Sequence, residues 1–378
     1  MLSCVRHSKH AIIHARTPSS RRYNPGARKR AISNFSPRKV VVSIYFDRFR
    51  QSFREVHAVS NALVMGSLSP KDHALREMMN FVLSPEQPSD YTHVFQYAHC
   101  RVESDYQDIV KISAAVHLLQ ASTFLTDDVF DGTMTRYSLP AVHRKYGASY
   151  AIIAAELLQS VAMETIGAEL DGGQFQHRCL AFQIFNQMMR ELYVGQFLDV
   201  FHTGDLRIAK SEYFRIIALA VGNFLAHLAR CGALLAGKPA SEVEALSSFG
   251  YHYGMALFIT DDIVDVADRP EVTGKSYAAD LRNRRMRLPV ILALKMGKPS
   301  DVRSLKRLLL KKKELSPAEI EQARGVVLRS GALGACLKIA KRHLAKSVEA
   351  LATLKESPTT ENLRWLAKTL LTAQRLAG

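Results

Sequence analysis

Three observations predict an all-α protein. From Phe46 onward, apolar residues recur at spacings of three and four, which is the period of a helix with one buried face. Breaks that contain glycine or proline separate the long apolar stretches, where helices are expected to end. Neither alternating strand patterns nor a repeated strand–helix order is found. We therefore expect residues 47–378 to form a single helical domain of ten or more helices.

The helices can be placed in chain order from the same pattern. Most are expected within six apolar-rich stretches: 105–129, 149–169, 177–202, 211–236, 241–265 and 287–297. Two later helix starts are marked by capping residues. Ser316-Pro317-Ala318-Glu319 is a capping box with proline at the first helical position. Ser357-Pro358 opens the last helix in a similar way.

The basic charge of the chain is concentrated at its N-terminus. The formal net charge is +16, from 51 Lys and Arg against 35 Asp and Glu. Residues 1–46 hold ten of the basic residues and no acid, so the rest of the chain has 41 against 35, or +6. This segment is also rich in Ser and Arg, which is typical of a mitochondrial or plastid transit peptide. A disordered basic arm is the alternative reading; without a transit peptide, we expect a cytoplasmic protein.

Composition excludes several other classes of protein. The body has no arrayed basic helix, so we expect no nucleic-acid partner. The best membrane-span candidate, Ile216 to Gly237, is interrupted by Asn223, His227 and Arg230, so we expect no transmembrane segment. Five scattered cysteines without a CxxC motif argue against a disulfide framework or a structural zinc site.

Two aspartate clusters are the candidate metal-binding residues. Asp127, Asp128 and Asp131 end one apolar stretch, and Asp261, Asp262 and Asp265 end another. On a helix, the first and last Asp of each cluster share a face. Two carboxylates about 5 Å apart repel by roughly 3 kcal/mol at an effective dielectric of 20. Bound cations would relieve this repulsion, and carboxylates suit Mg²⁺ that shares its shell with phosphate oxygens. The pattern predicts two or three Mg²⁺ ions that clamp a diphosphate, with all six aspartates as ligands.

Basic residues follow both clusters. Arg136 comes after the first cluster and Lys275 after the second. Either side chain could contact diphosphate oxygens, arginine through two parallel hydrogen bonds and lysine as a point charge.

With these motifs, residues 60–375 resemble the trans-isoprenyl diphosphate synthase (polyprenyl synthetase) family. The two clusters resemble its two aspartate-rich motifs. Further similarities follow in order along the chain: Arg136, Pro140 and His143; Gly195-Gln196-Phe197-Leu198-Asp199; Gly232 to Gly237; Gly274-Lys275; Asp280; and Leu288-Pro289.

The resemblance implies the fold and the reaction. It implies an isoprenoid synthase-type helical bundle with a central apolar cavity, generally dimeric as a homodimer or a heteromer with a related synthase. It implies Mg²⁺-assisted ionisation of an allylic prenyl diphosphate, which isopentenyl diphosphate then attacks. Gln196 joins Arg136 and Lys275 as an implied substrate-binding residue. The positions before the first motif form part of the family's cavity floor; here they are the small Ser122 and Thr123, which predicts room for a product of C20 or longer.

The departures from the family pattern concentrate on the acceptor side. Of the basic segment that binds isopentenyl diphosphate in this family, only Arg76 remains. The Lys-Thr pair of the central helix is Ala220-Val221, and the Gln before the second motif is Phe258. Arg287 replaces a Thr, and we interpret it as a surface arginine rather than a compensating cation. The metal-binding half of the site is therefore expected to be intact and the acceptor half degraded.

Three functions stay open from the sequence. The first is a prenyl diphosphate synthase that elongates its substrate. The second is a terpene synthase-like enzyme that cyclises or quenches an allylic diphosphate without isopentenyl diphosphate. The third is a regulatory subunit of a heteromeric synthase, although such subunits commonly lose the aspartates that are all present here.

Overall fold

The computed structural model describes residues 37–84, 90–100, 109–137, 139–169, 175–267 and 278–372. The chain divides into two compact units, Met1–Ser36 and Pro37–Gly378, and all described residues belong to the second. The expected boundary between residues 46 and 47 falls within the first helix of that unit, α2 (Pro37–Ser67). Whether residues 1–46 act as a separate segment stays a prediction.

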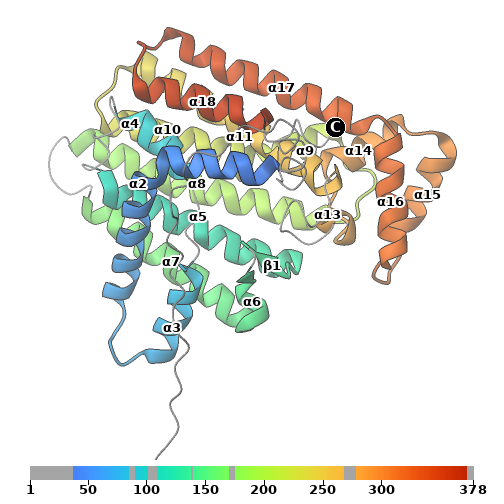
Figure 1. The fold of residues 1–378 in the computed structure, drawn as a ribbon, viewed down its shortest axis with the longest axis horizontal. Coiled ribbons are helices and arrows are strands. Elements are labelled where there is room, and N and C mark those ends of the chain that lie inside the picture. The colour runs from blue at the N-terminus through green and yellow to red at the C-terminus, as the bar shows by residue number, and fades with distance from the viewer. Residues whose placement is uncertain are drawn as a thin grey trace, which may run out of the picture. The chain divides into compact units, whose positions relative to one another are not determined.

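The second unit is all-α, as predicted (Figure 1). Its only strands among the described residues are β1 (Thr135–Arg136) and β2 (Leu139–Pro140), which form a short antiparallel hairpin. The elements that form the site and its surroundings are α3 (His73–Val82), α4 (Asp90–His99), α5 (Val110–Asp131), α6 (Val142–Lys145), α7 (Ala148–Glu169), α8 (Phe175–Phe201), α9 (Lys210–Ile217), η2 (Ala218–Gly222), α10 (Asn223–Leu235), α11 (Ala240–Ala267), α13 (Ala279–Arg282) and α14 (Leu288–Met296). The C-terminal elements are α15 (Pro299–Leu309), α16 (Pro317–Arg329), α17 (Ala332–Ala350), η3 (Leu351–Thr353) and α18 (Pro358–Thr372).

The predicted helices are confirmed within a few residues at most boundaries, with one informative exception. The stretch 211–236 is not one α-helix, because α9 passes through the π-helical turn η2 before α10 begins. Such π-turns locally widen a helix and are frequent at functional sites. The capping box at Ser316 is present, with the Glu319 amide donating to the Ser316 side chain and the Glu319 side chain accepting from the Ser316 amide.

Two hydrophobic clusters hold the helices together. The first joins α4, α5, α7, α8 and α10, and the second joins α11, α14, α16 and α17. In Figure 1, α17 lies along α11 and α18 lies beside α17, as their contacts also show. The ends of α5 and α8, Phe258 of α11 and the turn η2 line one cavity, and the candidate site lies there.

Two helices are apolar and long enough to span a membrane by length and composition alone: Ala148–Glu169 and Lys210–Leu235. In the second, 67% of the most apolar window is buried inside the unit, so core packing accounts for its hydrophobicity. In the first the share is 44%, and the remainder contributes to an exposed apolar face described below. The expectation of no transmembrane segment stays a prediction.

Candidate functional site

The first aspartate cluster lies on the last turn of α5. Gly132 ends this helix in the left-handed region, at φ +60°, a conformation that glycine adopts without strain. Asp127 and Asp131, one turn apart, both line a cavity that is described below. A helix C-terminus carries partial negative charge, so carboxylates there need cationic partners.

Asp128, the middle member of this cluster, is turned away from the cavity and buried. Its two oxygens accept a paired hydrogen bond from Arg136, with Nε–Oδ2 at 2.8 Å and Nη2–Oδ1 at 2.7 Å. The Arg136 guanidinium also lies over the Phe124 ring, 4.4 Å from its centroid. Arg136 therefore ties the β1–β2 hairpin to the end of α5, and its charge is largely matched by Asp128.

The three aspartates of the second cluster, at the end of α11, differ in exposure and in their hydrogen-bond partners. Asp261 is exposed. Asp262 is buried and accepts hydrogen bonds from the Tyr213 hydroxyl at 2.6 Å and the Leu288 amide at 3.3 Å. Asp265 accepts from the amides of Ala279 and Asp280, both at 3.1 Å. These two side chains thus hold α13 and the start of α14 against α11.

Two arginines just before α14 connect the clusters. Arg285 donates from Nη2 to Asp131 Oδ1 at 2.6 Å, and its Nη1 lies 3.4 Å from Asp199 Oδ2. Arg287 donates from Nη1 to Asp199 Oδ1 at 2.6 Å, and its Nε lies 3.8 Å from Asp262 Oδ1. Asp199, on α8, therefore bridges the two arginines, and the chain of ion pairs runs from one aspartate cluster to the other.

Arg287 also corrects an interpretation made from the sequence. It is not a surface arginine: only 8% of it is exposed, and its Nε also donates to Asp280 at 3.1 Å. Burial by itself would lower the pKa of Arg287, but Asp199 and Asp280 raise it well above its usual range. The guanidinium is therefore a permanent buried cation.

The carboxylates open onto a cavity of about 100 Å³ between α4, α5, α8, α11 and η2. Its polar end is formed by Asp127, Asp131, Gln196, Asp199, Arg285 and Arg287, and its aromatic walls by Tyr91, Phe124, Phe130, Phe224 and Phe258. Gln196 Nε2 donates to Asp127 Oδ1 at 2.5 Å. Gly195 lets α8 approach η2 closely, because a Cβ there would lie 2.9 Å from the Ala220 nitrogen. The cavity thus combines an anionic rim that carries arginines with an apolar interior.

The electrostatics of the rim indicate a site that would accept cations. Removal from water, with Asp131 as the next largest cause, raises the pKa of Asp127 to about 7. Burial also raises the pKa of Asp262 well above its usual range, although Arg287 opposes this shift. A carboxyl whose pKa is raised by neighbouring carboxyls is one whose ionised form a bound cation would stabilise.

The residues fit a divalent metal in part. Asp127 and Asp131 supply the hard oxygen donors that Mg²⁺ prefers, on one face of one helix and at one cavity. In the part of the chain that the structure describes, no three His, Cys, Asp or Glu side chains are already grouped as a metal site. Arg285 contacts Asp131 instead, so metal binding would require this arginine to turn toward an incoming anion.

The structure places the other predicted site residues unequally. Thr123 lines the cavity, whereas Ser122 does not line it and donates from its buried hydroxyl to the Leu119 carbonyl at 2.7 Å. Arg76 is not brought to the cavity: its Nη1 donates to the carbonyls of Met65 and Leu68, near the end of α2. Lys275 lies outside the described residues.

Sequence reasoning missed three residues. Arg285 was detectable only as one of several arginines between Arg282 and Arg287, and Tyr213 gave no signal on its apolar-rich helix. Tyr91 lies outside the motifs altogether. Each acquires its place through a contact with a residue distant in the chain.

Fold and site together define a helical protein with an apolar cavity whose rim carries carboxylates and arginines. Comparison with known proteins shows which family this protein belongs to. A model of the polyprenyl synthetase family matches residues 90–327. The chain belongs to this family. Among curated relatives, geranylgeranyl diphosphate synthase of Mycobacterium tuberculosis is 28% identical over 257 residues, which are 67% of this chain and 71% of the relative. Geranylgeranyl diphosphate synthase of Methanosarcina mazei is 27% identical over 273 residues, 72% of this chain and 82% of the relative.

Solved structures share the fold. A polyprenyl synthase from Caulobacter crescentus, complexed with calcium and isoprenyl diphosphate, superposes with a TM-score of 0.77 at 23% identity, covering 88% of this chain and 97% of that one. Geranylgeranyl pyrophosphate synthetase from Pyrococcus horikoshii gives a TM-score of 0.75 at 23% identity, with coverage of 86% and 97%. The isoprenoid synthase-type fold predicted from the sequence is thereby confirmed.

Proposed function

We propose that this chain is a Mg²⁺-dependent prenyltransferase-type enzyme that ionises an allylic prenyl diphosphate. The observation that carries the proposal is the single cavity in which Asp127, Asp131, Arg285 and Arg287 face aromatic walls. A diphosphate leaving group needs positive charge at the rim, and an allylic cation needs an apolar space without water. Two arginines at the rim and aromatic side chains along the walls support this assignment, with bound metal supplying the further positive charge that the aspartates call for.

The contacts of the groups at the rim support a proposed role for each. Asp127 and Asp131 would hold the metal, oriented by Gln196 through its hydrogen bond to Asp127. Bound Mg²⁺ would offset the charge that develops on the departing diphosphate. Asp261, exposed at the end of α11, is the member of the second cluster best placed for a further ion. Asp128, Asp262 and Asp265 would act through the elements that they fix in place. Two or three Mg²⁺ ions remain the expected number.

Arg285 and Arg287 would bind the diphosphate oxygens. Each is held by aspartates now, and each has a guanidinium with more donors than its present partners use. If Asp131 and Asp199 turned to a bound cation, these donors would be available to the anion. Lys275 and Arg136 remain proposed contacts of the same group.

For the step after ionisation, we propose head-to-tail attack by isopentenyl diphosphate; the two curated relatives described above are named geranylgeranyl diphosphate synthases, which supports a chain-elongating reaction. A specific observation favours a second candidate. Arg76, the only cation left from the family's acceptor segment, is engaged by two backbone carbonyls and does not reach the cavity. A terpene synthase-like enzyme, which cyclises or quenches the cation without an acceptor, needs no such arginine.

Product analysis separates the candidates. Purified protein with Mg²⁺ and geranyl or farnesyl diphosphate is incubated with and without isopentenyl diphosphate, and products are identified by mass spectrometry. Longer diphosphates that require isopentenyl diphosphate support elongation. Hydrocarbons or alcohols formed without it support the second candidate, and no turnover in either mixture refutes both and favours a regulatory subunit.

We further propose that a second copy of the chain covers the exposed apolar face of α7 and α8. Tyr150 and Ile153 on α7 are 58% and 51% exposed, and Phe197 and Phe201 on α8 are 66% and 68% exposed. A groove between these helices is lined by Met163, Met189 and Tyr193 among others. Exposed apolar area of this extent is typical of an interface. Sedimentation analysis should show a dimer that Ile153→Glu dissociates; a wild-type monomer would contradict this, and a heteromer with a related synthase would then be the alternative.

A further inference from the structure

Two aromatic rings line the cavity at the level of Leu192 on α8, away from the carboxylates near Asp199: Phe224 follows Asn223, whose side chain donates to Glu191, next to Leu192, at 2.7 Å. Tyr91, at the start of α4, and Phe224, at the start of α10, both line the cavity. Their ring centroids are 5.2 Å apart and their planes are inclined by 68°, an edge-to-face contact. Phe224 is only 1% exposed, so its ring is fixed by packing on the far side as well.

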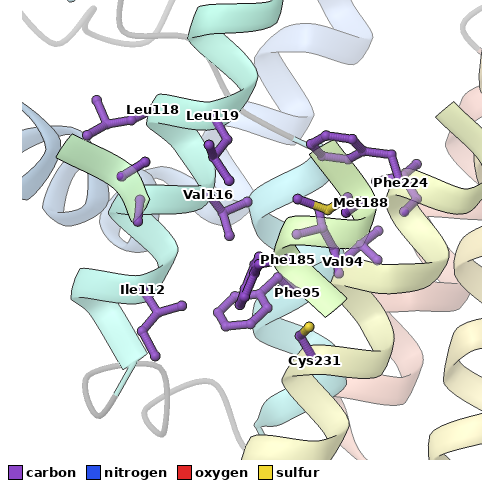
Figure 2. Packing of buried hydrophobic residues seen from close by; sticks show 14 of the residues in the cluster. Val94, Phe95, Ile112, Val116, Leu118, Leu119, Phe185, Met188, Phe224 and Cys231 are labelled. Atoms are coloured by element: carbon purple, nitrogen blue, oxygen red, sulfur yellow. The ribbon is translucent and has the colours of Figure 1, made fainter. Parts of the chain in front are cut away.

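The space beyond this ring pair is filled. Figure 2 shows Phe224 beside Met188 and Val94, with Phe95 and Phe185 in the same cluster. All five side chains are at most 1% exposed, and the centroids of Phe95 and Phe185 lie 6.3 Å apart. Protein interiors are packed at crystal-like density, so a chain cannot pass through this layer unless aromatic side chains move.

The mouth of the cavity is less constrained than this floor. Phe130, which lines the mouth beside Asp131, is 51% exposed. The open volume of about 100 Å³ is smaller than the roughly 150 Å³ cavity that binds benzene, so any prenyl tail must displace some side chain. The exposed Phe130 ring can rotate into solvent, whereas the Phe224 ring is surrounded by packed side chains and cannot move without displacing them. We therefore expect the cavity to enlarge at its mouth and to keep its floor.

The depth of the cavity follows from the helix that forms its wall. On α8 the lining extends from Val200 to Leu192, and the carboxylate-bearing Asp199 is seven residues from Leu192, or about 10.5 Å at 1.5 Å per residue. An isoprene unit adds four chain bonds of about 1.5 Å each, or roughly 5 Å once bond angles are counted. The wall therefore matches about two isoprene units.

We infer that Tyr91 and Phe224 are the specificity-determining floor of this site and restrict the allylic substrate to a short tail of about two isoprene units. The inference rests on the proposed function, which it deepens by naming the substrate class. It also moves the floor away from Ser122 and Thr123. Thr123 lies on the wall, and Ser122 does not line the cavity. The small size of those two residues then creates no extra length, and the C20 expectation loses its structural basis.

The test compares tail lengths in two ligand series. In the first, unreactive thiolodiphosphates with C10, C15 and C20 tails are titrated calorimetrically in the presence of Mg²⁺. In the second, C10 and C15 prenyl alcohols are assayed by thermal stabilisation without metal, which probes the apolar cavity independently of the diphosphate clamp. The variants are Tyr91→Ala and Phe224→Leu. Phe249→Leu is the control, because Phe249 is a fully buried ring of the same hydrophobic cluster that does not line the cavity.

For the wild type we expect the C10 analogue to bind at least tenfold more tightly than the C20 analogue. This gap should fall below about threefold in Tyr91→Ala and Phe224→Leu and stay unchanged in Phe249→Leu. If Phe224→Leu does not fold, the partly exposed Tyr91 still decides the question. A C20 analogue that binds as tightly as C10, or a gap unchanged in the folded floor variants, overturns the inference. A third outcome separates the two proposals: only the alcohols bind, the C10 alcohol binds more tightly than the C15 alcohol, and Tyr91→Ala removes this preference. That result would support Tyr91 and Phe224 as the floor and refute the proposed diphosphate chemistry.

Discussion

Arg287 Nη1 lies 2.6 Å from Asp199 Oδ1, and this ion pair joins the end of α8 to the start of α14 inside the site. Through Arg285, Asp199 is also connected to Asp131 on α5, so one carboxylate positions both arginines. The side chains of the rim are therefore held in place by one another. Its aspartates already have cationic partners, which a metal–diphosphate pair would have to rearrange.

Arg287→Met should destabilise the metal-free protein. Removing one partner of a buried ion pair leaves the other uncompensated, at a cost of about 3–5 kcal/mol. Asp199 and Asp280 would both lose a donor. Urea unfolding without metal measures the change. Adding Asp199→Asn should recover part of the loss, and a single variant as stable as the wild type would contradict the network.

Asp127 and Asp261 should be essential for turnover. Replacing either by Ala should lower the rate at least a hundredfold, on the order of 3 kcal/mol, if each holds a metal against the diphosphate. Asp301→Ala is a suitable control, because Asp301 lies on α15 and pairs with Arg329 outside the site. Steady-state rates at saturating Mg²⁺ provide the measurement; near-normal rates in both site variants would refute these assignments.

The raised pKa of Asp127 predicts a pH-dependent stability. Its folded-state pKa is about 7, against an ordinary value of 3.8. The unfolded chain therefore loses this proton first, and the stability of the metal-free protein should fall as pH rises from about 4 to 7. Asp127→Asn removes this penalty, so its melting temperature should exceed that of the wild type at pH 8 and approach it at pH 4.5.

The same comparison with saturating Mg²⁺ is the internal control. A bound cation favours the ionised carboxyl, so the advantage of Asp127→Asn at pH 8 should disappear or reverse. Asp301→Asn controls for the loss of one negative charge. If Asp127→Asn raises the melting temperature by the same amount at pH 8 and at pH 4.5, ionisation of a buried Asp127 is not the reason for the gain in stability.

Isopentenyl diphosphate should bind poorly to the isolated chain, well above the micromolar range. Each missing charge-assisted hydrogen bond is worth about 1.5–3 kcal/mol, and the loss of two or three weakens binding by several powers of ten. Calorimetry with Mg²⁺ and an unreactive allylic analogue measures this affinity. Arg76→Ala should leave it unchanged while lowering stability, because Arg76 holds backbone carbonyls. Low-micromolar binding that Arg76→Ala abolishes would show the acceptor site to be intact.

The sequence was sufficient for features that depend on neighbours along the chain. Helical periodicity located α5, α7, α8 and α11, and i, i+4 spacing placed Asp127 and Asp131 on one face. It could not separate aspartates that face the cavity from those that hold the fold, because Asp262 is fixed by Tyr213 and Leu288. Long-range partners were equally hidden: Arg285 meets Asp131 across 154 residues, and only packing brings Tyr91 against Phe224.

The most direct test of the central claim is the Mg²⁺-dependent release of inorganic diphosphate from geranyl diphosphate by the purified chain. We expect release that saturates with Mg²⁺, stops with excess chelator and falls at least a hundredfold in Asp127→Ala. This holds for elongation when isopentenyl diphosphate is supplied and for cyclisation or quenching without it. No release above the uncatalysed rate, with and without isopentenyl diphosphate at saturating Mg²⁺, would contradict the proposal that this cavity ionises an allylic diphosphate.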